Sequence, residues 1–205
     1  REKTYWPILC LVQVAGPDEA WAIDPLAEGL DLSPLFDLFA DENILKVFHA
    51  GRQDLEIFYH LAGQLPMPVF DSQIAAMVCG YGDSVGYDTL IGSLTGVRID
   101  KSSRFTDWSV RPLSDRQIDY ALGDVTHLRV AYEKLKATLE SNGRADWLVE
   151  EMAVLTAAKT YYVDPTQAYL RLKVRNPKPR LLAVLREVAS WRQIQAEKRD
   201  LPRNR

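Results

Sequence analysis

With 47% hydrophobic and 26% charged residues over a length of 205, the chain has the composition of a globular protein, which excludes a disordered or fibrous one. No apolar run approaches the roughly 20 residues of a membrane-spanning helix, and the first residues lack the order of a signal peptide, so we expect a cytoplasmic protein without a membrane partner. The net charge of −3 argues against nucleic-acid binding through a broad positively charged surface. The two cysteines lack metal-ligand spacing, so we expect them to be free buried thiols.

The first half of the chain predicts a mixed β-sheet with helices against its faces. Two short apolar runs flank Gly16-Pro17-Asp18, which is typical of a β-hairpin. Further strands and helices then alternate along the chain. The predicted strands cover residues 8–15, 20–24, 44–50 and 68–71, and the predicted helices cover 33–40, 52–62 and 72–79, with Asp71 as the N-cap of the last.

The second half predicts helices over residues 88–94, 114–140 and 144–160. In the longest, the apolar stripe leaves Tyr120, Asp124 and His127 on its flank, where the core meets solvent. Gly123 lies inside this helix, where glycine costs about 1 kcal/mol relative to alanine, so we expect close packing beside Asp124.

The composition changes after residue 163. Residues 164–177 resemble a linker, and a further helix is predicted over 181–197. From Tyr169 to Arg205 there are eleven Lys or Arg and three Asp or Glu, a charge of +8 that leaves −11 for the rest of the chain. A basic tail suits phosphate backbones, although a solvated charged helix also explains such a run.

Three residues could form part of a metal-dependent nuclease site. Tyr120 and Asp124 are four residues apart, so both side chains reach the same side of one helix. Asp54 lies in the first turn of a helix that follows a strand. Either acidic residue alone is equally well explained as a helix-dipole or surface charge, so the prediction depends on their combination.

Longer motifs point to one family. They read H-A-G-x-x-D-L-E-x-F from His49, D-S-Q-I-A-A from Asp71, and D-K-S-x-x-x-T-D-W-x-x-R-P-L-x-x-x-Q-x-x-Y-A-x-x-D-V from Asp100. This ordered series resembles bacterial ribonuclease D, of the DEDDy class of 3′-5′ exonucleases with a ribonuclease H-like fold. The resemblance runs from Thr4 to about Arg205.

The resemblance implies a site with two divalent cations, Mg²⁺ or Mn²⁺. Asp54 and Asp124 would be ligands, and Tyr120 would position the attacking water. Oxygen ligands suit these hard cations, and a pair of them can activate water and stabilise the leaving oxygen. Residues expected near the RNA substrate are His49, Gln53, Lys101, Arg104 and Arg111.

The chain departs from the family pattern at its first motif. The family places Asp-Thr-Glu-Phe immediately before a segment like Arg1-Glu-Lys-Thr-Tyr-Trp-Pro, on a central strand, so two carboxylates would be absent and the sheet would have an open edge. The end of the chain resembles the start of an HRDC domain. The expected domains are an exonuclease domain over 1–163, a linker over 164–177 and the beginning of the HRDC domain over 178–205.

We therefore expect a 3′-5′ exoribonuclease that releases nucleoside 5′-monophosphates and trims tRNA precursors, with no protein partner implied. Two alternatives remain from the sequence. One is a related DNA exonuclease, and the other is an RNA-binding module without catalysis. An Asp-x-Glu encoded upstream of Arg1 would favour the enzyme over the binding module.

Overall fold

The computed structural model describes residues 4–202; residues 1–3 and 203–205, at the outer ends of the predicted domains, lie outside the described residues. The chain forms two compact units. One is Leu9–Ala157, and the other consists of the described parts of Arg1–Ile8 and Ala158–Arg205. The expected boundary after residue 163 therefore falls within the second unit.

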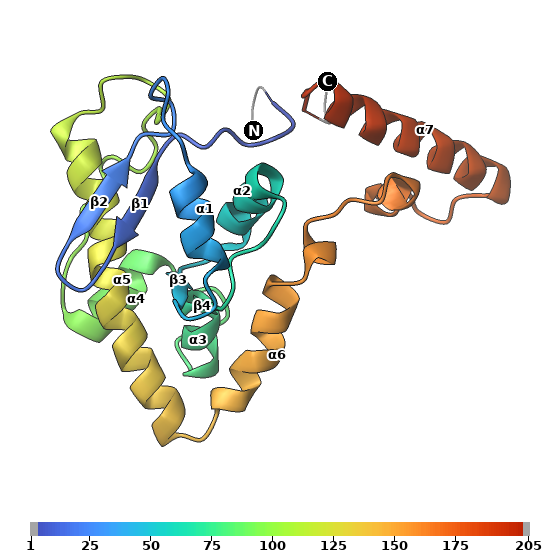
Figure 1. Cartoon of the computed structure of the whole chain (residues 1–205). Helices are drawn as coiled ribbons and strands as arrows, with labels where there is room; N and C mark the ends of the chain where they lie inside the picture. The colour runs from blue at the N-terminus through green and yellow to red at the C-terminus, as the bar shows by residue number, and fades with distance from the viewer. Residues whose placement is uncertain (1–3, 203–205) are drawn as a thin grey trace. The chain divides into compact units, whose positions relative to one another are not determined.

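The strands of the first unit form two separate pairs (Figure 1). β1 (Val12–Ala15) pairs antiparallel with β2 (Ala20–Ile23), as the hairpin prediction required. β3 (Lys46–Phe48) pairs parallel with β4 (Val69–Asp71), with Phe48 opposite Asp71. The predicted α/β class with antiparallel and parallel pairing is confirmed, but within residues 4–202 the strands make two pairs and not one continuous sheet.

Helices surround these strands. In the first unit they are α1 (Ser33–Ala40), α2 (Arg52–Ala62), α3 (Ser72–Val78), α4 (Tyr87–Thr95), α5 (Asp115–Ser141) and α6 (Ala145–Leu155). The predicted bounds of the first two are confirmed, and Ser114 caps α5 through a capping box with Gln117. The prediction of one helix over 144–160 was wrong, because α6 ends at Leu155 and a short 3-10 helix, η1 (Ala158–Thr160), follows it.

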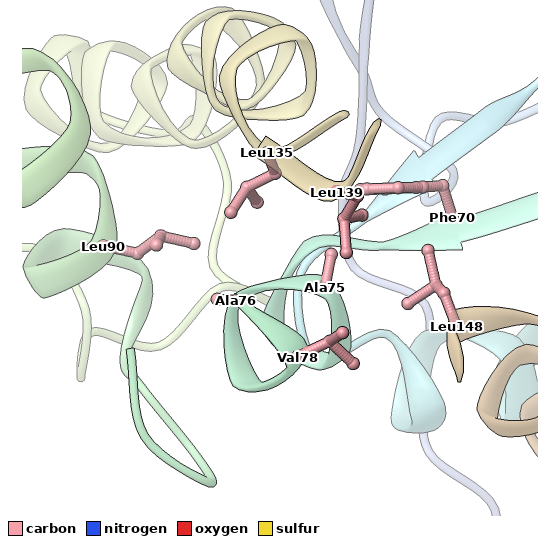
Figure 2. Close-up of a cluster of buried hydrophobic side chains, with 8 residues drawn as sticks. All are labelled: Phe70, Ala75, Ala76, Val78, Leu90, Leu135, Leu139 and Leu148. Atoms are coloured by element: carbon pink, nitrogen blue, oxygen red, sulfur yellow. The ribbon is translucent and has the colours of Figure 1, made fainter. Parts of the chain in front are cut away.

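The long helix α5 organises the core of the first unit. It packs against β1, β2, α3 and α4, and the hairpin lies along it in Figure 1. Figure 2 shows the larger buried cluster, where α5 contributes Leu135 and Leu139 and α3 contributes Ala75 and Ala76. Burying such side chains contributes roughly 1.5–3 kcal/mol for each large aliphatic residue. The helix that carries Tyr120 and Asp124 is thus fixed by its C-terminal half.

The second unit is built around α7 (Pro179–Lys198). η2 (Pro165–Arg171), a 3-10 helix inside the segment predicted as a linker, packs against it. The Arg186 guanidinium lies 4.8 Å from the centre of the Tyr169 ring and donates to its hydroxyl. The Asp200 carboxylate accepts the backbone N–H groups of Tyr5 and Trp6, each at 3.0 Å, which attaches the N-terminal segment to the end of this helix.

Over residues 4–202, no helix combines the length and apolar character that crossing a bilayer requires.

Candidate active site

Asp54 is positioned by an unusually tight turn between β3 and α2. Ala50 has a positive φ of 53°, and Gly51 then starts the turn into the helix, where a Cβ would lie only 2.6 Å from the Cβ of Phe48. No ordinary side chain fits at that distance, so glycine is required at residue 51. Asp54 follows in the first turn of α2, as predicted.

Asp71 holds this turn in place from the neighbouring strand. Its buried carboxylate accepts the backbone N–H groups of Ala50 (3.1 Å) and Gly51 (2.8 Å). It also accepts those of Gln73 (2.8 Å) and Ile74 (3.4 Å), which confirms it as the N-cap of α3. One carboxylate thus connects the starts of two helices, and it fixes the backbone that carries Asp54.

The surroundings of Gly123 differ from the predicted close packing beside Asp124. A Cβ built on Gly123 meets nothing within 4 Å, so the predicted close packing at this position was wrong. The backbone carbonyl of Gly123 instead accepts a hydrogen bond from the Tyr87 hydroxyl at 3.1 Å. The glycine costs helix stability without a packing reason.

The two glycines give a matched pair of stability predictions. Gly51→Ala is expected to lower the free energy of unfolding by about 1–3 kcal/mol, because the added methyl overlaps Phe48. Gly123→Ala is expected to raise it by about 0.5–1 kcal/mol, because alanine favours the helix and the space is open. Urea unfolding of both variants checks this, and destabilisation by Gly123→Ala would contradict it.

Asp54, Tyr120 and Asp124 line one cavity of about 450 Å³ in the first unit, called the site cavity below. Tyr120 and Asp124 come from successive turns of α5, and the Tyr120 hydroxyl interacts with the Asp124 carboxylate closely enough to lower its pKa. Both are half-buried, which confirms their predicted place on the flank of the apolar stripe. Of the other predicted site residues, the cavity is also lined by His49, Lys101 and Arg104.

Two predicted substrate residues are placed differently. Gln53 is exposed on α2 and is not among the residues that line the site cavity. Arg111 donates all five of its N–H groups inside the chain: two to the Asp24 carboxylate (2.6 and 2.7 Å) and three to the carbonyls of Trp108, Val110 and Cys10. Its donors are saturated, so we assign Arg111 to holding its loop against the hairpin and not to binding phosphate.

Tyr87 and Asp88, at the start of α4, also line the site cavity but were not predicted as site residues from the sequence. The Tyr87 ring lies edge-on to His49, with ring centres 5.4 Å apart. Asp88 forms a 2.6 Å salt bridge with Lys101 and so offsets part of that positive charge. An aromatic residue in a first helical turn looks the same in sequence as an ordinary core residue, which is why Tyr87 was missed.

Both site carboxylates have raised pKa values. The surrounding protein atoms desolvate Asp54 and raise its pKa to about 6, although the side chain still has an exposed face, and the charge of Asp71 adds to this. Burial likewise raises the pKa of Asp124 to about 6, against the lowering effects of the Tyr120 hydrogen bond and of Arg104. Burial and the neighbouring Asp124 charge raise the pKa of Tyr120, which therefore stays protonated and can donate a hydrogen bond at neutral pH.

These residues fit part of a divalent-cation site. Asp54 and Asp124 offer hard oxygen ligands, and neither forms a salt bridge within the described part of the chain. A cation beside them would compensate the charge that burial disfavours. Among residues 4–202, however, no group of three or more His, Cys, Asp or Glu residues is placed to hold a metal ion. Asp54 and Asp124 are thus two candidate cation ligands that line the same cavity.

The raised pKa of Asp54 predicts a pH-dependent stability effect in the metal-free chain. The folded state holds the proton more tightly than the unfolded state, so this contribution is present below about pH 4 and is lost as pH rises through about 6. Asp54→Asn is therefore expected to stabilise the chain at pH 7.5 by about 1 kcal/mol, a value reduced for the solvent that reaches this side chain. Melting temperatures at pH 7.5 and pH 4 in EDTA check this; an equal effect at both pH values would contradict it.

Comparison with known proteins gives consistent matches. A family model described as 3′-5′ exonuclease matches residues 2–140. Ribonuclease D of Nitrobacter hamburgensis is 57% identical over the whole chain, which spans 54% of that relative. The chain thus spans about half the length of such curated relatives, and the expected resemblance to ribonuclease D is confirmed.

Solved structures agree with this. The crystal structure of Escherichia coli RNase D, described as an exoribonuclease involved in structured RNA processing, matches with a TM-score of 0.90 and 37% identity, covering 100% of this chain and 54% of that one. Brucella melitensis NrnC matches in a structure with bound Mg²⁺ (TM-score 0.64, 32% identity) and in one bound to pGG (0.65, 34%), with 72% of each chain covered.

Proposed function

Because the chain belongs to the 3′-5′ exonuclease family, we propose that it is the nuclease part of a ribonuclease D-type enzyme that removes nucleotides from the 3′ end of RNA. The observation that carries the proposal is the meeting of Asp54, Tyr120 and Asp124 in one cavity from two different helices. The proposed products are nucleoside 5′-monophosphates, and the proposed substrates are tRNA precursors.

Each residue has a defined task in this proposal. Asp54 and Asp124 would hold divalent cations, Mg²⁺ or Mn²⁺, and a pair of such ions would supply activation of water and stabilisation of the leaving 3′ oxygen. The protonated Tyr120 hydroxyl, which interacts with the Asp124 carboxylate, would orient the attacking water. Arg104 and Lys101 at the cavity wall neutralise the phosphate, with Lys101 partly committed to Asp88. The His49 Nδ1 is hydrogen-bonded to the Ser72 hydroxyl at 2.9 Å, and His49 would lie near the terminal nucleotide.

We further propose that the remaining acidic ligands arrive on a strand inserted between β1 and β3. Among the described residues, each of these strands has an unpaired edge. Val12 and Gln13 of β1 and Val47 and Phe48 of β3 line both the site cavity and an adjoining, largely apolar one of about 710 Å³. A strand there would pair with both edges and would bring its side chains to Asp54 and Asp124.

The predicted domain boundaries remain a proposal as well. Residues 178–205 would begin an HRDC domain, because α7 exposes a row of apolar side chains that a single helix cannot bury. These are Leu181, Val184, Val188, Trp191 and Ile194. The cytoplasmic location predicted from the sequence also stays a prediction.

The test is an assay of the full-length protein on 5′-labelled single-stranded RNA. We expect stepwise shortening from the 3′ end, release of nucleoside 5′-monophosphates, complete inhibition by EDTA, and recovery with Mg²⁺ or Mn²⁺. Faster cleavage of the matching DNA would favour the DNA exonuclease. Binding of RNA without shortening under all metal conditions would favour the RNA-binding module and contradict the proposal.

A further inference from the structure

Phe105 is held almost completely in solvent. Its side chain is 91% exposed, the highest value for any large hydrophobic residue within residues 4–202. Isolated exposed apolar residues are common on protein surfaces, so exposure alone assigns no function. The inference rests instead on the hydrogen-bonded turn that holds the ring and on the neighbouring Arg104.

The loop keeps Phe105 outside by fixing the residues on both sides. The buried Ser103 donates to the Arg116 carbonyl (3.4 Å) at the start of α5. Thr106 donates from its hydroxyl to the Ser103 carbonyl (2.8 Å) and accepts from Gln117 (3.1 Å). The backbone next to the ring is therefore tied to α5, the helix that also carries Tyr120 and Asp124. The ring projects from an ordered turn at a fixed place relative to that helix.

The neighbouring Arg104 connects the ring with the site cavity. Its guanidinium carbon lies 5.2 Å from the centre of the Phe105 ring, within cation–π distance. Arg104 also lines the cavity together with Asp54, Tyr120 and Asp124. An exposed aromatic ring thus adjoins a cation that lines the site cavity, although Phe105 itself is not among the lining residues. Aromatic rings bind nucleobases by stacking, while arginine binds the phosphates between them.

We propose that Phe105 stacks on a nucleobase near the 3′ end of the RNA while Arg104 contacts the adjacent phosphate. This inference rests on the proposed function and adds a base-binding surface to it. Stacking tolerates any base because every base has a π-face, so the contact would position RNA without reading its sequence.

The test measures kcat/KM of the full-length protein in Mg²⁺ on single-stranded RNA. The same RNA is then tested as a series in which a single abasic nucleotide occupies each of the 3′-terminal positions in turn. Phe105→Ala is expected to lower kcat/KM on intact RNA by about 5- to 150-fold. When the abasic nucleotide occupies the position of the stacked base, Phe105→Ala and the wild type are expected to have the same kcat/KM, because neither can then stack on a base. Phe105→Trp is expected to retain activity.

Trp147→Ala is the matched control. Trp147 on α6 is also exposed (62%), with the Arg144 guanidinium carbon 5.2 Å from its ring centre, but Arg144 does not line the site cavity, whereas Arg104 does. We expect this variant to equal the wild type, and both alanine variants to keep the wild-type melting temperature. Unchanged kcat/KM in Phe105→Ala, or the same loss at every abasic position, would overturn the inference. Failure of the wild type to shorten RNA would instead overturn the proposed function.

Discussion

Asp124→Asn in the full-length protein is expected to reduce Mg²⁺-dependent shortening of RNA by about 10³-fold or more, because cation binding contributes several kcal/mol to the transition state. Asparagine keeps the size of the side chain but removes the charge that a cation requires. It also changes the group that interacts with the Tyr120 hydroxyl, which we propose to orient the attacking water. Initial rates of 5′-monophosphate release, measured over a range of Mg²⁺ concentrations, check this.

The fold is expected to survive this substitution. Asp124 is half-buried on the flank of α5, and burial raises its pKa to about 6, so loss of the charge does not remove a stabilising interaction at neutral pH. The matched control is Asp119→Asn, an exposed residue of the same helix that does not line the site cavity. It is expected to leave the rate unchanged. Undiminished activity in Asp124→Asn would exclude the two-metal assignment.

Local sequence signals predicted much of the fold. Periodicity set the bounds of α1 and α2, and the strand-then-Asp71 pattern identified an N-cap. The end of α6 was not predictable in the same way, because the stretch from Leu155 to Tyr161 contains no glycine or proline to stop the helix. Local sequence signals also could not show whether the strands join into one sheet, since strand pairing depends on contacts between residues far apart in the chain.

For the site, spacing brought Tyr120 and Asp124 together, and the family motif added Asp54. The task of Arg111 could not be read from sequence, because its carboxylate partner, Asp24, is distant in the chain. In a motif an arginine with saturated donors looks the same as one free to bind phosphate. Phe105 was missed for a similar reason, since exposure depends on how the neighbouring turns are hydrogen-bonded.

Completing the site is expected to have the second large effect. The 205-residue chain should bind Mn²⁺ weakly, because two carboxylates cannot replace most of the water around a cation that prefers about six oxygen ligands. Adding an N-terminal segment that carries an Asp-x-Glu, on the strand that we propose between β1 and β3, is expected to tighten Mn²⁺ binding by about 100-fold or more. Isothermal titration calorimetry of both forms checks this.

The strand and its carboxylates can be separated in the same experiment. An extension with both acidic residues changed to their amides should still pair with the open edges of β1 and β3, and should therefore raise the melting temperature as the unchanged extension does. It should not tighten Mn²⁺ binding, because amides bring no charge. Tight binding by the 205-residue chain alone, lost on Asp54→Ala, would instead mean that Asp54 and Asp124 suffice, and the inserted strand would then have no part in holding the metal.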